Sequence, residues 1–429
     1  MLKPAFGIRI ALLNLLIAAF LGVTLRFIFI HEIPGIDFMK ILHAHSHIAM
    51  LGWVFVAIYV HYIEGFLLPP QRKSSFYRMV FWLNQLAVMG MLVAFPLQGY
   101  GGWAIFFSTA QMILSYFFAY RFLKDFRKTP HHGQFSGLLV KASFFWMILS
   151  TLSLWAMGPI MALQLKGSAL YYMSVQFYLH FQFNGWFLFA ILALIFREME
   201  NLGLRFVRGK LLWFFYLLSI SCLLTFLLAV TWSNPVKILF WLNSAGVLLQ
   251  FAASALLIEV IWRNRASLKQ KFGQASGMLT ISLLAFVLKV LIQTVVIIPY
   301  IATIAYTIRN FVLGFIHLIL LGVVTHFMLG ISMQKGWLVV AARRPRLGMF
   351  LFQAGFIGSE SLLFLQGILL WAKLGFLPYY HEMLFTISAF MPVGLAIVLT
   401  AGSTGNFFGF FRPVKGWMAL AKNQEERSQ

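Results

Sequence analysis

Twelve stretches of this 429-residue sequence are each long and apolar enough to cross a lipid bilayer, and no other feature constrains the fold as strongly. A transmembrane helix needs about 20 mostly apolar residues, and the alternative membrane-spanning structure, a closed barrel, uses much shorter strands. Charged residues make up 10% of the chain, against about 25% in a typical soluble domain. We therefore predict an all-α, polytopic membrane helix bundle that forms a single transmembrane domain over residues 1–429. The predicted spans are 5–30, 39–68, 76–97, 102–123, 138–164, 169–196, 210–232, 236–262, 276–299, 305–333, 347–372 and 380–402.

The basic residues orient this bundle. When the spans are numbered in order, 26 of the 33 Lys and Arg residues lie near the two termini or follow even-numbered spans. Loops rich in Lys and Arg stay in the cytoplasm. Both termini are therefore predicted to be cytoplasmic, and every even-numbered helix runs from the outer to the inner side. The net charge of +22 is spread over several loops, so we expect its partners to be anionic membrane lipids and not nucleic acid. We place the protein in the inner (cytoplasmic) membrane as a multi-pass protein.

Histidine is distributed unevenly among the spans. Four of the eleven histidines fall in loops or at span edges, and the other seven all fall on helices 2, 6 and 10. Ionisable residues inside a membrane are costly and usually functional, so this concentration points to one shared site. The seven are His43, His45, His47 and His61 on helix 2, His180 on helix 6, and His317 and His326 on helix 10.

The positions of these histidines predict their depths, because helices 2, 6 and 10 run in the same direction. Counted from the inner basic loops at about 1.5 Å per residue, His180 and His317 lie at nearly one level in the outer half of the bilayer. His61 and His326 share a second level nearer the cytoplasm. The histidines of these three helices therefore lie at a few common levels.

The cluster at the outer end of helix 2 has two faces. His43 and His47 are four residues apart and share a face, whereas His45 points elsewhere.

Imidazole is the commonest metal ligand and a standard axial ligand of haem iron, and a bundle with 47 Phe and 13 Trp suits a porphyrin. The single cysteine, Cys222, excludes a cysteine-based zinc or iron–sulfur site, and the lack of a CxxCH motif excludes a c-type haem attached to this chain.

The run HAHSHIAMLGW at residues 43–53 resembles helix 2 of the haem–copper oxidase superfamily. It is most similar to the small proteins related to cytochrome oxidase subunit I that carry a HAHxNxxGW-type motif there. Aligned on the Leu-Gly-Trp that ends the run, the two histidines of that motif match His45 and His47. The superfamily, which includes nitric oxide reductase, also resembles this chain in its twelve helices, its cytoplasmic ends and its histidines on helices 2, 6 and 10.

The resemblance implies a cofactor and an activity. It implies haem b, one or two per chain, with His45 or His47 and one of His317 and His326 as axial ligands, and it places His180 at the helix-6 metal ligand. It further implies respiratory electron transfer or the reduction of a diatomic gas, O2 or NO, with a cytochrome or a quinol as electron donor.

Three differences from this family argue against copper or another second metal. Helix 7, at 210–232, contains no histidine, whereas the copper site of the family draws two from it. Asn184 stands four residues after His180, where oxygen-reducing members often carry tyrosine. His317 and His326 are nine residues apart, roughly 13 Å along a helix, whereas the helix-10 histidines of the family are two residues apart. The sequence thus predicts haem binding more strongly than oxidase chemistry.

Lys289 in span 9 and Glu360 in span 11 are further ionisable residues inside spans, and we assign them to a candidate proton path. Two other functions stay open. One is a non-enzymatic haem or metal protein for nitric oxide tolerance or sensing, which the missing helix-7 histidines favour. The other is a secondary transporter, since twelve spans with both ends inside is also a transporter plan. Transporters usually show two related halves, and no clear internal repeat is apparent in the sequence.

Overall fold

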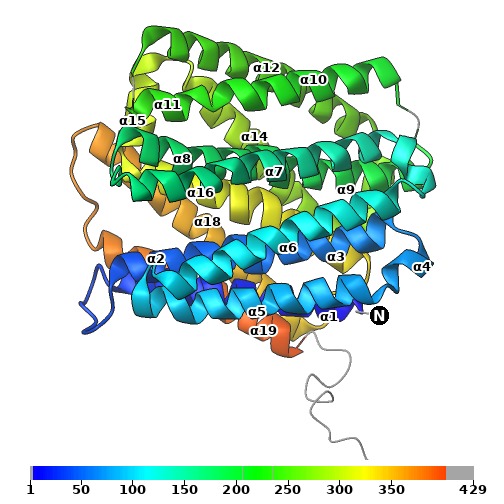
Figure 1. The fold of residues 1–429 in the computed structure, drawn as a ribbon, viewed down its shortest axis with the longest axis horizontal. Coiled ribbons are helices and arrows are strands. Elements are labelled where there is room, and N and C mark those ends of the chain that lie inside the picture. Colours follow the sequence, from blue (N-terminus) through cyan, green and yellow to red (C-terminus); the bar gives the residue numbers. More distant parts are fainter. Residues whose placement is uncertain (1–2, 205, 234, 402–429) are drawn as a thin grey trace, which may run out of the picture.

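The computed structural model describes residues 3–204, 206–233 and 235–401, so the basic residues predicted for the cytoplasmic C-terminus lie outside the described part. Within it the chain is helical and has no strand. All twelve predicted spans are confirmed as helices long and apolar enough to cross a membrane, and Figure 1 shows them running side by side. Spans 1 to 6 are α1 (Pro4–Phe27), α2–η1–α3 (Phe38–Phe66), α5 (Ser75–Gln98), α6 (Gly102–Phe126), α7 (Phe135–Ala162) and α8–η3–α9 (Ala169–Asn201). Spans 7 to 12 are α10–α11 (Arg208–Ser233), α12 (Lys237–Arg263), α13–η4–α14 (Arg265–Val295), α16–η5–α17 (Arg309–Gln334), α18 (Arg343–Trp371) and α19 (Tyr380–Ala401).

The helix of span 9, α14 (Ser276–Val295), begins at the predicted residue 276. The basic segment α13 (Arg265–Phe272) before it is a separate helix, because Gly273 has a positive φ of 49° and a short 3-10 turn follows. Span 9 ends at Val295 instead of residue 299, because Pro299 starts a separate short helix, α15 (Pro299–Thr307). Proline is favoured in the first turn of a helix, where its missing N–H costs nothing. The first residues predicted for span 10 therefore belong to α15.

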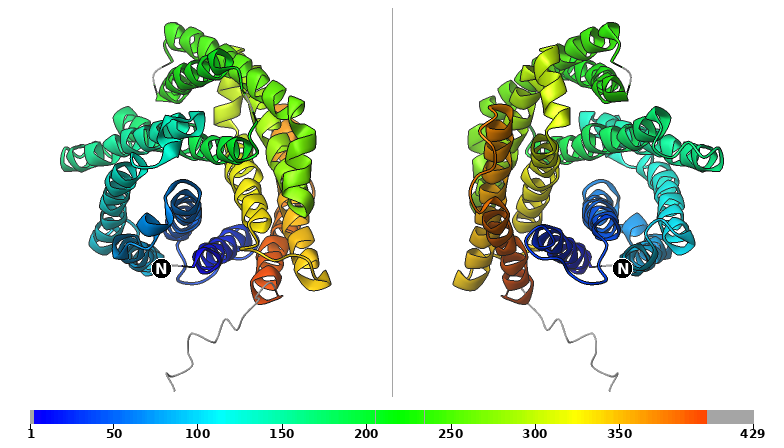
Figure 2. Two further views of the ribbon diagram at one scale, coloured as in Figure 1. Left: turned by 90° about the vertical axis from the view of Figure 1, so that its right-hand side faces the viewer. Right: turned by 90° about the vertical axis from the view of Figure 1, so that its left-hand side faces the viewer.

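The twelve helices form three groups of four with the same arrangement. In each group the first helix packs on the middle of the second: α1 on η1, α7 on η3 and α14 on η5. The second helix packs on the third, and the third on the fourth, through the pairs α5–α6, α10–α12 and α18–α19. The fourth helix of each group contacts the first helix of the next, and α19 closes the ring on α1. Figure 2, which looks along the helices, shows α2 and α3 in blue inside the bundle, with α1 on one side and α5 and α6 on the other.

The second helix of each group carries a π-helical segment, and these are the three helices that hold the seven histidines. The segments are η1 (Ile48–Val54), η3 (Phe181–Phe187) and η5 (Leu318–Thr325). Each follows directly after a histidine: His47, His180 and His317. Short π-helical segments are rare and occur mostly at functional sites. This repeat is faint in the sequence, where its only mark is the pattern HxxxxG at His47–Gly52, His180–Gly185 and His317–Gly322.

The glycine of each motif lets the first helix of its group approach closely. A Cβ atom added at Gly52 would lie 3.1 Å from the side chain of Asn14, and one added at Gly185 would lie 2.7 Å from that of Trp146. At Gly322 the nearest atom would be Ala285 Cβ, at 2.8 Å. Because any larger residue would push the helices apart, the three glycines fix where helices 2, 6 and 10 sit.

Asn14 joins three helices at the first of these contacts. Its Nδ2 donates to the carbonyl oxygen of Gly52 and to Oε1 of Gln85, both at 2.9 Å. Hydrogen bonds between membrane helices contribute about 0.6 kcal/mol on average and up to about 1.7. We therefore expect Asn14→Ala to lower the free energy of unfolding by about 1–2 kcal/mol, measured by unfolding in mixed detergent micelles. Thr24→Val is the control, because the Thr24 hydroxyl bonds only to Phe20 within its own helix; an equal loss in both variants would contradict this role.

We call the half of each helix nearer the end where α1 begins its inner half and the other its outer half, after the predicted orientation. The inner halves of helices 2, 6 and 10 form the tightly packed centre of the molecule. Trp53 Nε1 donates to Thr325 Oγ1 at 2.8 Å, which links helix 2 to helix 10.

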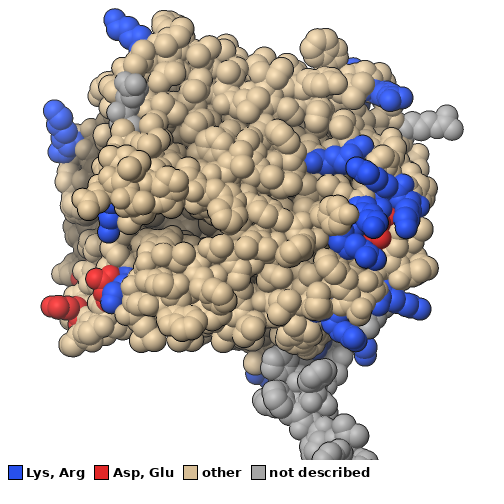
Figure 3. All heavy atoms as spheres, in the orientation of Figure 1, with Lys and Arg blue, Asp and Glu red and all other residues tan. Residues whose placement is uncertain are grey.

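Figure 3 shows Lys and Arg gathered at one end of the bundle, on the right, which is the end where α1 begins. Few charges lie at the other end, and these are the two faces that the sequence pattern predicts to be the inner and outer sides.

Candidate functional site

The outer halves of helices 2, 6 and 10 lack the packing that their inner halves have. Only Ile41 and Ala44 are buried in α2 (Phe38–His47), only Ser174 in α8 (Ala169–His180) and only Gly314 in α16 (Arg309–His317). By contrast, all seven residues of η3 are buried. Figure 3 shows a hollow on this face of the molecule, in the half away from the basic end. Because helices 2, 6 and 10 lie inside the bundle, the partly exposed side chains of their outer halves border space within the protein.

His45 and His317 lie in the same region of this outer half. They come from helices 2 and 10 and lie within electrostatic range of one another. His45 Nδ1 donates to the carbonyl oxygen of Ala18, at 2.8 Å, which makes Nε2 the nitrogen with the free lone pair. Neither Nε2 atom has a hydrogen-bond partner among the residues that the structure describes. Each of these two imidazoles thus keeps one ring nitrogen available as a ligand atom.

Two charged residues adjoin this pair. Glu360 of α18 places Oε1 3.8 Å from His317 Nδ1, and both of its carboxylate oxygens are buried without a hydrogen bond. Arg26 of α1 lies within electrostatic range of Glu360, His45 and His317, and its Nη1 is 3.5 Å from the carbonyl oxygen of Leu384. Sequence reasoning counted Arg26 as an outer-side charge and missed it as a site residue. Its position within span 1 is the signal that could have identified it.

His43 and His47 lie on the other face of helix 2, as their spacing predicts. His47 Nδ1 is 2.8 Å from the carbonyl oxygen of His43, and its Nε2 is 3.4 Å from the Tyr100 hydroxyl. Both rings contact Phe95 and Tyr100, with centroids 4.4 to 6.0 Å apart. The structure therefore separates these two histidines, which face helix 3, from His45, which faces helix 1.

His61 and His326 lie in the packed inner half and have different neighbours. His61 Nε2 is 3.0 Å from Ser332 Oγ, and its ring lies 4.9 Å from that of Trp337. His326 Nδ1 donates to the carbonyl oxygen of Leu321 at 2.7 Å, and its Nε2 is buried without a partner. His61 and His326 were predicted to lie at equal depth, but in the described part of the chain they do not contact each other. His326 instead packs on Phe352 and Phe356 of α18.

His180 has both ring nitrogens engaged by its surroundings. Its Nε2 donates to the carbonyl oxygen of Cys222 on helix 7, at 2.8 Å. Its Nδ1 is 3.4 Å from Nδ2 of Asn184. Helix 7 thus offers His180 a backbone carbonyl in place of a side-chain ligand. Among the residues that the structure describes, no three His, Cys, Asp or Glu side chains form a group that could hold a metal ion. Lys289 of α14 lies within electrostatic range of His180.

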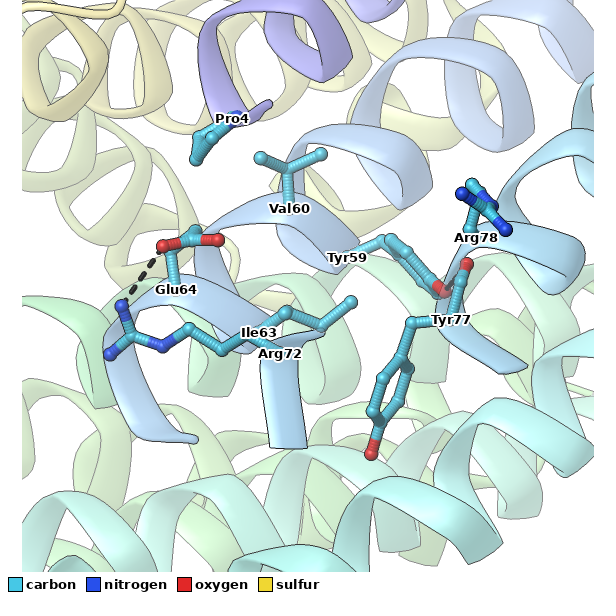
Figure 4. Close-up of a pocket in the computed structure, with 8 residues that line it drawn as sticks. All are labelled: Pro4, Tyr59, Val60, Ile63, Glu64, Arg72, Tyr77 and Arg78. Atoms are coloured by element: carbon cyan, nitrogen blue, oxygen red, sulfur yellow. Dashed lines mark hydrogen bonds and ion pairs between the residues drawn. The ribbon is translucent and has the colours of Figure 1, made fainter. Parts of the chain in front are cut away.

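A separate pocket lies at the basic end, between the inner ends of helices 1, 2 and 3 (Figure 4). Arg72 crosses it to pair with Glu64, at 3.0 Å, and Tyr59 donates to the carbonyl oxygen of Tyr77, at 2.5 Å. None of the predicted ligand residues lines it. We therefore assign it to the anchoring of the helix ends.

Comparison with known proteins adds no further information about this site. No protein-family model matches the chain, and no curated protein matches it. The assignment of a function therefore rests on the geometry of the pair His45 and His317 and on the sequence pattern around it.

Proposed function

We propose that this membrane protein binds a b-type haem in the outer half of the bundle, with His45 and His317 as axial ligands, and that it transfers electrons. The observation that supports this most directly is the pair of unpartnered Nε2 atoms on two neighbouring helices, next to internal space. In this proposal the protein is a divergent relative of the haem–copper oxidase superfamily in the inner membrane. Its electrons come from a cytochrome or a quinol and pass to a diatomic gas, O2 or NO.

The residues around the pair fit such a group. The carbonyl of Ala18 fixes the tautomer and the orientation of His45, as outer hydrogen-bond partners do for metal-bound histidine. Glu360 lies beside Nδ1 of His317 and would act on that ring in the same way. Arg26 brings a positive charge suited to the carboxylates of a porphyrin. A haem held by two imidazoles supplies one-electron transfer at iron.

The test is a visible spectrum of the purified protein, oxidised and reduced, together with metal analysis for iron and copper. We expect a Soret band, low-spin iron with two imidazole ligands by electron paramagnetic resonance, and about one iron per chain. Protein that folds and is monodisperse but lacks both iron and a Soret band, even after incubation with haem, would overturn the proposal and favour the transporter reading.

A further inference from the structure

The turn between helices 4 and 5 holds a histidine against an arginine at the basic end of the bundle. This turn, η2 (Pro130–Gly133), comes just before α7 (Phe135–Ala162). Its backbone lies close over the first turn of α7, where a Cβ atom added at Gly137 would be 2.5 Å from the carbonyl oxygen of His131. This packing fixes the position of His131, whose Nε2 is 2.7 Å from Nη2 of Arg197 on helix 6.

The hydrogen bonds around this pair require a neutral His131. A guanidinium group can only donate, so Nε2 of His131 accepts from Arg197. Nδ1 of His131 in turn donates to Oε1 of Gln134, at 3.2 Å. The same oxygen accepts from Nη1 of Arg197, also at 3.2 Å, and Nε of Arg197 donates to the carbonyl oxygen of Gly65, at 3.0 Å. One guanidinium group thus ties the turn to the inner ends of helices 2 and 6.

Arg197 forms no ion pair among the residues that the structure describes. Two carboxylates lie within electrostatic range of it. Of these, Glu198 pairs with Lys335, at 2.6 Å, and Glu200 accepts from a backbone N–H in the first turn of α7, at 2.9 Å. The hydrogen bonds of the guanidinium group therefore go to neutral acceptors, and the imidazole of His131 is one of them.

A proton on His131 is incompatible with this arrangement. Nε2 would then carry a hydrogen and could no longer accept, and two cations would stand in direct contact. The charged groups that act on the imidazole are Arg197 and, on α4 (Pro69–Arg72), Arg72, and both are positive. Burial, together with these two charges, lowers the pKa of His131 below its ordinary value. The imidazole is only partly buried, so protons from the aqueous phase reach it.

We propose that the contact between His131 and Arg197 is a latch on the inner side of the membrane, closed near neutral pH and opened by acid. When closed, it holds residues 130–134 against the ends of helices 2 and 6. The closed form is favoured above the ordinary histidine pKa of about 6.5 and loses this preference as the pH falls, because only the released turn takes up the proton. Opening frees the inner end of helix 6, and this inference does not depend on haem binding.

The test is hydrogen–deuterium exchange of the purified full-length protein at about pH 7.5 and about pH 5.5, with rates corrected for the intrinsic effect of pH. We expect the opening equilibrium of residues 130–138 to increase in acid by up to about tenfold, the limit for an imidazole of pKa about 6.5 that titrates only in the open form. His131→Gln should stay closed at both pH values, because its amide oxygen accepts from Arg197 but takes up no proton. Arg197→Gln should be open at both.

His132→Gln is the matched control. The ring of His132 packs on Phe126, with centroids 5.6 Å apart, so its loss should leave the pH dependence unchanged. A native turn that opens equally at both pH values would overturn the proposal, and so would full pH dependence in His131→Gln. If His131→Gln does not fold, Arg197→Gln decides, because pH-dependent opening that survives without the guanidinium group also refutes the latch.

Discussion

His45→Ala and His317→Ala are each expected to lower the haem content of the purified protein at least about tenfold. Even the outer partners of metal ligands typically contribute 10–100-fold to affinity, and each substitution removes one of the two iron ligands themselves. The loss should appear as a diminished Soret band and reduced iron per chain. Haem that remains bound should change from low-spin to high-spin, because one axial position becomes open.

The specificity of this effect depends on two further variants. His47→Ala should keep its haem, because His47 faces Phe95 and Tyr100 on the other side of helix 2. His381→Ala is the control for the loss of an imidazole, since that ring stacks on Phe29 outside the site. If His47→Ala loses haem and His45→Ala retains it, the ligand assignment is wrong, although the proposal of haem binding would stand.

Gly394→Ala is expected to destabilise the protein severely. Helices α18 and α19 cross with their backbones in contact, and a Cβ atom at Gly394 would lie 2.3 Å from the carbonyl oxygen of Gly348 and 2.6 Å from the backbone nitrogen of Phe352. Backbone atoms cannot turn aside as a flexible side chain can. The helices must therefore separate, and overpacking of this kind costs about 1–3 kcal/mol or more. Thermal unfolding in detergent, or the yield of folded protein, measures the effect.

Gly277→Ala provides the matched control. Gly277 lies in the first turn of α14 (Ser276–Val295), and a Cβ atom added there would meet nothing within 4 Å. Because alanine has the higher helix propensity, by about 1 kcal/mol, this variant should be as stable as the native protein or more stable. If Gly394→Ala matched it, the close crossing of α18 and α19 would not be needed for stability.

The sequence by itself determined the number of spans, because about 20 apolar residues are needed to cross the bilayer and each of the twelve stretches has them. It also determined that the histidines concentrate on helices 2, 6 and 10, and that His43 and His47 share a face away from His45. These properties follow from composition and from the 3.6-residue period, which are local. The end of span 9 was misjudged because hydropathy does not register that Pro299 begins a new helix.

Only the tertiary structure decided which histidines come together. Depth along parallel helices places His180 level with His317 and His61 level with His326, but it does not say which rings are neighbours. In the structure His317 lies near His45, while His180 bonds to the backbone of Cys222. The rotation of a helix about its own axis sets these contacts. A π-helical segment changes that rotation in the middle of helices 2, 6 and 10, so the faces that meet cannot be read from an ideal helical period. The position of Arg26 near His45, Glu360 and His317 depends likewise on the packing of helices 1 and 2 against helices 10 and 11, which lie far away in the chain.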